Sequence, residues 1–240
     1  MRVKQLLAGV AVLAFALGVA QANWMDDFEA YTLGSIDGQG GWGGWGGSAS
    51  EAGTVVAAPA IGTRSQEIET NSTDPLDYTD SVHQYAGYEG GQWRYTAWTY
   101  IPTSSATGTT YFILMNEYSD PAGPYAWSAQ LAMNLTTGLL NDDQAGGGQN
   151  IPLIKDQWVK LQLDIDLDNN TVETYYGATF VSTHQWYNPA GLNDHAAIEA
   201  VDLYSAFDMI VDPIYYDNMS LTPEPAAFAL LALALVLRRR

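Results

Sequence analysis

Apolar and polar residues alternate along several short stretches of the chain. The clearest stretch is 157–168, in which every second residue from 159 to 167 is apolar and the residues between them are lysine, glutamine or aspartate. A period of two is typical of a β-strand with one buried and one solvated face. Asp168, Asn169 and Asn170 then supply a hairpin turn, so a second strand is predicted up to position 177.

Further strands are predicted from runs rich in β-branched and aromatic residues. They cover 54–61, 91–102, 108–118, 125–135, 139–142, 197–207 and 213–221, and the glycine- and tryptophan-rich stretch 38–53 is predicted as a loop. In 91–102 both faces carry large rings, with Trp93 and Tyr95 on one and Trp98 and Tyr100 on the other. One face is therefore expected to be buried and the other functional or partly covered. Many short strands without a long helix predict an all-β sandwich or barrel.

The first 22 residues have a different pattern. Arg2 and Lys4 precede an apolar run over 6–19, and Ala20, Gln21 and Ala22 follow it. This order is typical of a secretory signal peptide, so signal peptidase is expected to cut after Ala22. The remaining protein is then exported.

The C-terminal residues form a second apolar segment. Twelve apolar residues, 226–237, lie between a Pro-Glu-Pro tripeptide and three arginines, 238–240. Twelve residues of helix span about 18 Å, which is less than the roughly 30 Å hydrocarbon core of a bilayer. The segment is therefore predicted to be a short helix that contacts the membrane transiently, with the arginines on the cytoplasmic side.

These ends leave 23–222 as one domain of 200 residues, a size that supports a single hydrophobic core. The domain holds four of the nine Lys and Arg residues and 26 of the 27 Asp and Glu residues, so its formal charge is −22. Such a charge repels nucleic acid and anionic lipid and leaves cations and neutral polymers as partners. Because the chain has no cysteine, an exported domain must be stabilised by its core, with or without a metal ion.

The C-terminal segment resembles the PEP-CTERM protein-sorting signal. Its three parts are the tripeptide Pro223, Glu224 and Pro225, the apolar helix 226–237 and the arginine cluster 238–240. The resemblance implies processing by an exosortase-type membrane protease in a Gram-negative bacterium that makes exopolysaccharide. It also implies export across the inner membrane and delivery to the cell surface or extracellular matrix.

The body, 23–222, resembles the concanavalin A-like (laminin G/glucanase) family. The resemblance rests on "DDFEAYTLGSIDGQGGW" (26–42), "DQWVKLQLDIDLDNNTVETYYG" (156–177) and "YYDNMSL" (215–221). It implies an antiparallel jelly-roll sandwich of two sheets, flanked by the signal-peptide helix and the C-terminal apolar helix.

The same resemblance implies a structural calcium site. In such jelly rolls calcium is often held outside the sandwich where the first and last strands are neighbours, which corresponds here to Asp27, Glu29 and Asp217. Ca²⁺ prefers several oxygen ligands, and carboxylates on adjacent strands supply them. The alternative is that these acids are solvated edge residues. The acidic stretch 164–168 does not fit an EF-hand, because positions six and twelve of that loop would be Asn169 and Tyr175.

Aromatic residues are the candidate sugar-binding groups. Sugars present flat C–H faces that stack on exposed rings beside polar side chains. Trp98 and Trp127 are the preferred candidates, because their strands also carry polar residues. The alternative is that both rings belong to the core.

Catalytic patterns are not recognised in the sequence. The E-x-D-x-(x)-E arrangement of glucanase-type jelly rolls is missing, and the nearest pair, Glu67 and Glu69, has no aspartate between its members. No G-x-S-x-G motif or zinc spacing of histidines occurs either. We therefore expect a non-catalytic surface protein that binds or organises polysaccharide. A structural or adhesive protein without sugar binding, and a hydrolase or a Tyr/His lyase, are the alternatives.

Overall fold

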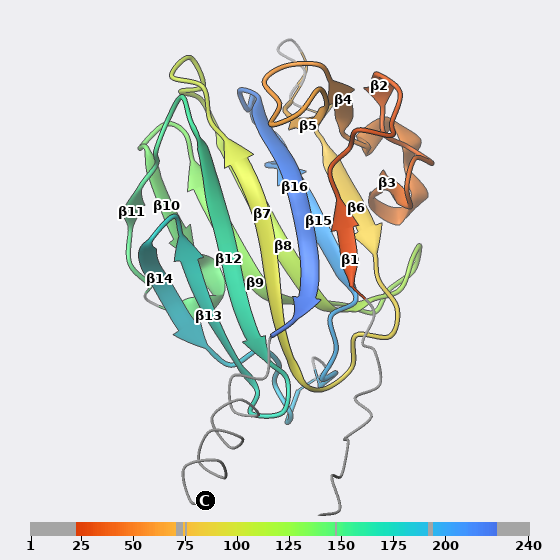
Figure 1. Cartoon of the computed structure of the whole chain (residues 1–240), viewed down its shortest axis with the longest axis vertical. Helices are drawn as coiled ribbons and strands as arrows, with labels where there is room; N and C mark the ends of the chain where they lie inside the picture. Colours follow the sequence, from red (N-terminus) through yellow and green to blue (C-terminus); the bar gives the residue numbers. More distant parts are fainter. Residues whose placement is uncertain (1–22, 71–73, 75, 147, 192–193, 225–240) are drawn as a thin grey trace, which may run out of the picture.

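A computed structural model describes residues 23–70, 74, 76–146, 148–191 and 194–224 as a sandwich of two β-sheets (Figure 1). All strand pairs that it describes are antiparallel. The predicted all-β, two-sheet antiparallel jelly roll is therefore confirmed. The helices predicted over 1–22 and 226–237 lie outside the described residues. Within the described ranges, no helix has the length and apolar character needed to span a bilayer.

The sheet nearer the viewer in Figure 1 is called the front sheet. Its strands, in spatial order, are β14 (Thr179–His184), β13 (Thr171–Tyr176), β12 (Trp158–Asp166), β7 (Gln92–Tyr100), β16 (Ile214–Pro223), β5 (Ser65–Ile68), β4 (Thr54–Val56) and β2 (Gly34–Ser35), and β1 (Trp24–Asp26) also pairs with β16.

The sheet behind it is called the back sheet. Its strands, in spatial order, are β11 (Ile151–Pro152), β10 (Leu139–Asp142), β9 (Tyr125–Asn134), β8 (Thr109–Tyr118), β15 (Ala200–Ser205), β6 (Asp80–Gln84) and β3 (Trp42–Gly44). Three short 3-10 turns complete the described elements: η1 (Trp45–Gly47), η2 (Ala49–Glu51) and η3 (Asp143–Ala145).

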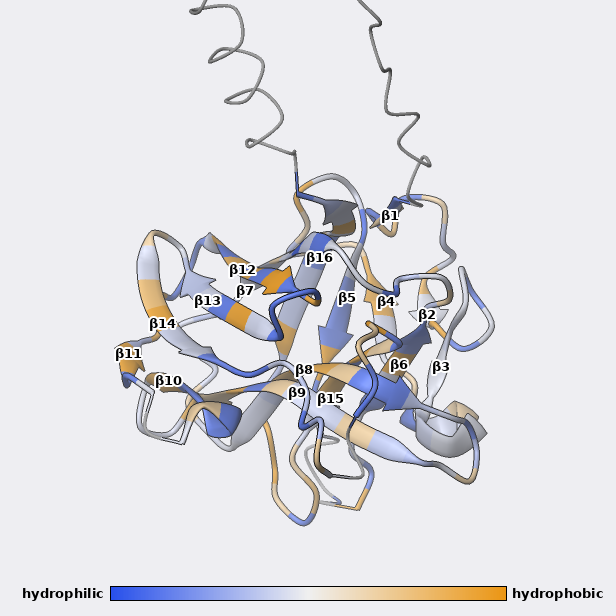
Figure 2. Ribbon diagram, turned by 90° about the horizontal axis from the view of Figure 1, so that it is seen from below, coloured by the Kyte–Doolittle hydropathy of each residue, from blue (hydrophilic) through white to orange (hydrophobic). Residues whose placement is uncertain are grey.

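The core lies between the inner faces of the sheets. Trp93, Tyr95 and Ala97 of β7 point into it and are almost completely buried, whereas Trp98 is half-buried on the outer face. The alternating apolar residues of β12 are buried in the same way. Figure 2, viewed along the sandwich, shows the two layers and the alternation of hydrophobic and hydrophilic residues along the strands. The face assignment made from the sequence for 91–102 and 157–168 is confirmed.

The stretch predicted as a loop, 38–53, is partly ordered. Trp42–Gly44 form β3, which pairs with β6 at the edge of the back sheet, so the loop prediction is wrong there. The strand was hidden because glycine has a low strand propensity. In β3 the backbone hydrogen bonds and the burial of Trp42, which is 2 % exposed, stabilise the pairing instead.

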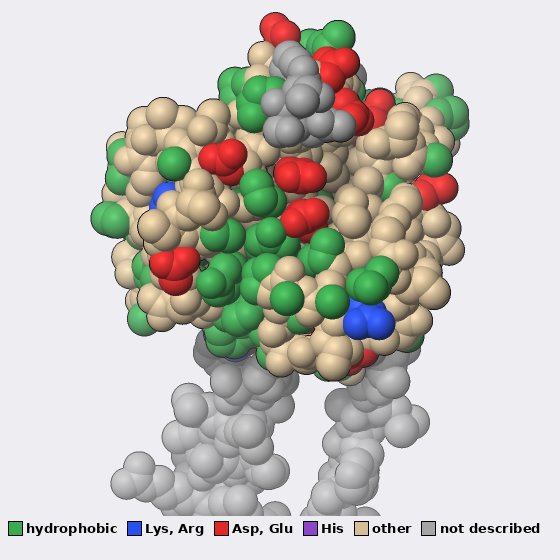
Figure 3. All heavy atoms as spheres, turned by 90° about the horizontal axis from the view of Figure 1, so that it is seen from above, with side chains coloured by type: hydrophobic (Ala, Val, Ile, Leu, Met, Phe, Trp, Pro, Cys, Tyr) green, Lys and Arg blue, Asp and Glu red, His purple; other side chains and the backbone are tan. Residues whose placement is uncertain are grey.

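The first and last described strands are neighbours. Trp24 pairs with Leu221 and Asp26 pairs with Met219, so the two ends of the described chain lie at one end of the sandwich (Figure 1). The opposite end displays a patch of hydrophobic side chains flanked by acidic ones, and basic side chains are sparse on it (Figure 3).

Candidate functional site

The outer face of the back sheet carries an apolar cluster that is separate from the main core. The cluster combines buried side chains from three strands with partly buried rings, namely Val82, Ile113, Met115, Tyr118 and Ala200 with Trp45, Tyr111, Tyr125 and Tyr204. A strand face turned toward solvent is normally polar. The partly exposed rings of this cluster make the outer face of the back sheet a candidate binding surface.

A cavity of about 420 Å³ opens on this face and is called the back-sheet cleft. Its walls are formed by residues of η1, β6, β8, β9 and β15, namely Trp45, Asp80, Ile113, Trp127, Gln130, Asp202 and Tyr204. The rings of Trp45 and Trp127 are almost parallel, with an interplanar angle of 10° and centroids 6.2 Å apart. The cleft thus combines aromatic surfaces with an amide and two carboxyl groups, which is the chemistry that sugars need.

Local glycine geometry places Trp45 in the cleft. A Cβ on Gly44 would lie 1.8 Å from the carbonyl oxygen of Ser48, and Gly46 has a φ of +61°, which is left-handed. A residue with a side chain would clash at position 44 and would be strained at position 46, so both positions require glycine. The chain can therefore turn sharply after Trp42 enters the core, and Trp45 packs on the outer face against Tyr125, with ring centroids 4.5 Å apart.

Trp127 occupies the middle of the face. The register between β8 and β9 shifts on both sides of Met115, the residue opposite Trp127, and such irregularities re-aim side chains. The Trp127 side chain is 38 % exposed. It lines the back-sheet cleft and also a second cavity of about 390 Å³, whose other lining residues include Gln144 and His184. Trp127 therefore belongs to the walls of both cavities.

Asp80 and Asp202 form a carboxyl pair on adjacent strands of the cleft. Asp202 is 3 % exposed and shares a hydrogen bond with Asp80. Burial raises the pKa of Asp80 to about 6, although the bond from Asp202 opposes this shift. Burial, together with the charge of Asp80, raises the pKa of Asp202 far above its ordinary value. The pair therefore retains one proton at neutral pH, and the two carboxyl groups share it in their hydrogen bond.

One oxygen of each carboxyl group is left without a hydrogen-bond partner. Within the part of the chain that the structure describes, Oδ1 of Asp80 and Oδ1 of Asp202 are buried and unpaired. A buried polar atom without a partner costs about 1–3 kcal/mol.

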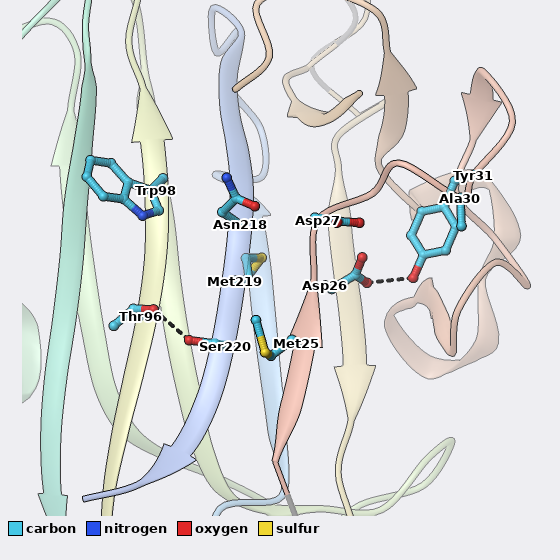
Figure 4. A pocket seen from close by; sticks show the side chains of 10 residues that line it. All are labelled: Met25, Asp26, Asp27, Ala30, Tyr31, Thr96, Trp98, Asn218, Met219 and Ser220. Atoms are coloured by element: carbon cyan, nitrogen blue, oxygen red, sulfur yellow. Dashed lines mark hydrogen bonds between the residues drawn. The ribbon is translucent and has the colours of Figure 1, made fainter. Parts of the chain in front are cut away.

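The front sheet carries a different pocket, of about 550 Å³ (Figure 4). It is lined by Met25, Asp26, Asp27, Ala30, Tyr31, Thr96, Trp98, Asn218, Met219 and Ser220. Its polar side chains are largely satisfied internally: the hydroxyls of Thr96 and Ser220 bond to each other at 2.7 Å, and Asp26 accepts from Tyr31 at 2.6 Å. The two predicted sugar-binding residues thus lie on outer faces of different sheets, and the structure does not bring Trp98 and Trp127 together.

Of the three predicted calcium ligands, Asp217 belongs to β16, and Asp27 and Glu29 follow β1. Asp217 is 1 % exposed and accepts a 2.7 Å hydrogen bond from the amide of Ile61. Burial raises the pKa of Asp217 to about 6, and the charges of Glu29 and Asp27 add to this shift. Glu29 accepts a 2.6 Å bond from the amide of Thr63. Among the described residues, no group of three or more Asp, Glu or His is placed to hold a metal ion. Calcium binding by Asp27, Glu29 and Asp217 stays a prediction that would need further oxygen ligands.

The first two residues of the Pro-Glu-Pro tripeptide are attached to the front sheet. Pro223 is the last residue of β16 and pairs with Trp93, and a carboxylate oxygen of Glu224 lies 2.6 Å from Nη2 of Arg94. The other predicted processing residues, Ala22 and Pro225, are outside the described residues.

No family model matches the chain, and no curated protein matches it in sequence. A solved sialidase superposes with a TM-score of 0.58 at 11 % identity, over 85 % of this chain and 19 % of that chain. The likeness identifies the fold. The chain spans about a fifth of that sialidase.

Two further solved structures match over nearly their whole length. The cellulose induced protein Cip1 has a TM-score of 0.53 at 15 % identity, over 84 % of this chain and 97 % of that chain. A carbohydrate esterase from the Shiga toxin-encoding bacteriophage phi24B has a TM-score of 0.50 at 10 % identity, over 84 % and 100 %. At such identities the match is one of fold. It agrees with the two-sheet β-sandwich expected from the sequence.

Sequence reasoning missed several residues of the back-sheet cleft. Trp45 was part of the predicted loop, and neither Asp80 nor Asp202 was a candidate. The available signal was the strand alternation that puts Asp202 on the same face as Ala200 and Tyr204.

Proposed function

We propose that this protein is an exported, non-catalytic protein that binds a polysaccharide chain along the outer face of the back sheet. The observation that carries this proposal is the position of Trp127, which is half-exposed, is almost parallel to Trp45 and lines two cavities. A ring that lines two separate cavities can contact consecutive sugar units on both of its sides, which favours a polymer over one small molecule. The names of the sialidase and the carbohydrate esterase, which share the fold, also refer to sugars.

The carboxyl pair supports a binding role over hydrolysis. Glycosidases that use two carboxyl groups keep them about 5 Å apart, or about 6.5–9.5 Å apart, so that the scissile bond fits between them. Asp80 and Asp202 are instead hydrogen-bonded to each other. A histidine-based lyase is also less favoured, because His184 uses Nε2 to contact Asp142 at 2.9 Å and Nδ1 to contact the carbonyl of Gln185 at 2.9 Å.

Affinity electrophoresis against a panel of soluble neutral and acidic polysaccharides tests the function. We expect retardation by at least one polymer, without release of reducing ends or unsaturated products on long incubation. Lack of retardation by every polymer would favour a structural or adhesive role, and released products would establish a hydrolase or a lyase.

The sequence signals at the two ends support export and processing. Mass spectrometry of the protein isolated from its host is expected to give a mature N-terminus at Asn23 and a C-terminus near the Pro-Glu-Pro tripeptide. A chain that keeps residues 1–22, or all three arginines 238–240, would contradict the corresponding step. An exosortase-type protease and a surface location are part of the same proposal.

A further inference from the structure

Positive charge is missing from the described walls of the back-sheet cleft. The described basic side chains make their contacts elsewhere: Arg94 with Asp164 and Glu224, Lys160 with Gln162, Lys155 with the carbonyl of Ser105, and Arg64 with the carbonyl of Thr63. The ionisable groups that do line the cleft are Asp80, Asp202 and Tyr204. A uronate or sulfate group in this cleft would meet no cationic partner.

The carboxyl pair at the cleft wall is held in one charge state near neutral pH. It retains one proton, and so carries one negative charge. Both carboxyl groups line the cleft. Sugar hydroxyls can donate to the carboxyl oxygens of the cleft wall, and an anionic sugar group would place a second negative charge beside a charge that is already poorly solvated.

We propose that the Asp80–Asp202 pair makes the back-sheet cleft selective for uncharged glycans, by accepting hydrogen bonds from sugar hydroxyls and repelling acidic sugar units. This inference rests on the proposed function and adds the class of ligand. The glycan is a neutral hexose or pentose polymer, whose rings stack on Trp45 and Trp127 while its hydroxyls meet Asp80, Asp202 and Gln130.

The selectivity depends on pH, because the pair loses its charge when Asp80 is protonated. Since the pKa of Asp80 is about 6, both carboxyl groups are neutral well below pH 6 while a uronate remains ionised. The other titratable groups that interact electrostatically with the pair are Glu51, Tyr78, Tyr118, Tyr204 and Tyr216. The pKa of each tyrosine is raised, so these four stay neutral over this range. Repulsion of acidic glycans therefore weakens on acidification.

The test compares one polymer in two charge states. The neutral polysaccharide that retards the protein best is partly oxidised at its primary alcohols to carboxylates, and both forms are measured by calorimetry near pH 7.5 in about 0.5 M salt. At that ionic strength the Debye length is about 4 Å, so the net charge of the protein as a whole is screened. We expect oxidation to weaken binding about tenfold or more.

Two comparisons assign the effect to the carboxyl pair. The double variant Asp80→Asn with Asp202→Asn removes the charge at almost unchanged shape. It is expected to reduce the loss of affinity on oxidation of the polymer to about threefold or less. Wild-type protein near pH 5 is expected to behave in the same way. Glu173→Gln, which removes one charge from an exposed position of β13 on the front sheet, is expected to keep the full loss. A melting curve checks that each variant is folded. If the double variant does not fold, Asp80→Asn alone or the pH series takes its place.

Each outcome bears on one of the two proposals. If the acidic form binds as well as or better than the neutral form, or if only an acidic polymer retards the protein, the selectivity is refuted while the polysaccharide-binding function stands. If selectivity is present but the double variant and the acidic pH leave it unchanged, the pair is not its cause. Binding to none of the polymers would overturn the proposed function itself.

Discussion

Replacing Trp127 by alanine is expected to weaken polysaccharide binding about tenfold or more while leaving the melting temperature nearly unchanged. The ring is 38 % exposed and lines both cavities, so its removal opens no buried void but takes away the stacking surface. An aromatic residue at the centre of a binding surface often contributes about 2 kcal/mol or more to the affinity, which corresponds to roughly thirtyfold. Affinity electrophoresis and calorimetry with the best-binding polymer measure the effect.

Trp98→Ala is the matched control for this experiment. It makes the same chemical change on the outer face of the front sheet, where Trp98 lines the front-sheet pocket. We expect Trp98→Ala to leave the affinity within about twofold of wild type and Trp45→Ala to weaken binding as Trp127→Ala does. If the losses are reversed, so that Trp98→Ala abolishes binding and Trp127→Ala does not, the front-sheet pocket is the site.

Most strands of the sandwich could be predicted because their burial pattern is local. In β7 and β12 the inward residues are all apolar or nearly so, and a period of two is visible in a few consecutive residues. The predicted runs 108–118, 125–135, 139–142 and 213–221 likewise correspond to β8, β9, β10 and β16 within two residues at either end. Local alternation and turn residues were sufficient there.

Strands β5 and β6 were missed because polar residues occupy their inner faces. Gln66 and Ser81 are both fully buried and bond to each other at 2.6 Å, from Nε2 to Oγ. The bond satisfies the buried amide nitrogen and the hydroxyl, but it joins residues that belong to different sheets. Nothing in either short segment indicates burial on its own.

The candidate site was predictable only in part for a similar reason. Trp127 was singled out from its own strand, and the structure places it on an exposed face. Asp80 and Asp202 become a pair only when β15 is placed beside β6, a contact between segments about 120 residues apart. Trp45 reaches the same face because two glycines allow a sharp turn. The site is thus a product of the sheet order, which single-sequence patterns do not contain.

Asp26→Ala is expected to cause the largest loss of stability among the single variants considered for this fold. Asp26 is 8 % exposed at the end of β1, and its carboxylate accepts three hydrogen bonds: from Nε1 of Trp42 at 2.8 Å, from the hydroxyl of Tyr31 at 2.6 Å and from the amide of Phe28 at 2.9 Å. Alanine leaves these donors without an acceptor in a region where Trp42 and Phe28 are almost fully buried. Each buried donor without a partner costs about 1–3 kcal/mol.

The sum of these costs predicts a loss of about 3 kcal/mol or more in the free energy of unfolding, measured by urea denaturation at constant m-value. For a domain of this size such a loss lowers the melting temperature by about 6–12 °C. Asp27→Ala is the control, because the neighbouring Asp27 is exposed and its only side-chain hydrogen bond among the described residues is a 3.2 Å contact with the amide of Glu29. We expect its effect to stay within about 0.5 kcal/mol. If Asp26→Ala lowers the free energy of unfolding no more than Asp27→Ala does, the bonds that join β1 to Trp42 do not hold the N-terminal strand in the sandwich. The pairing of β1 with β16 would then hold it.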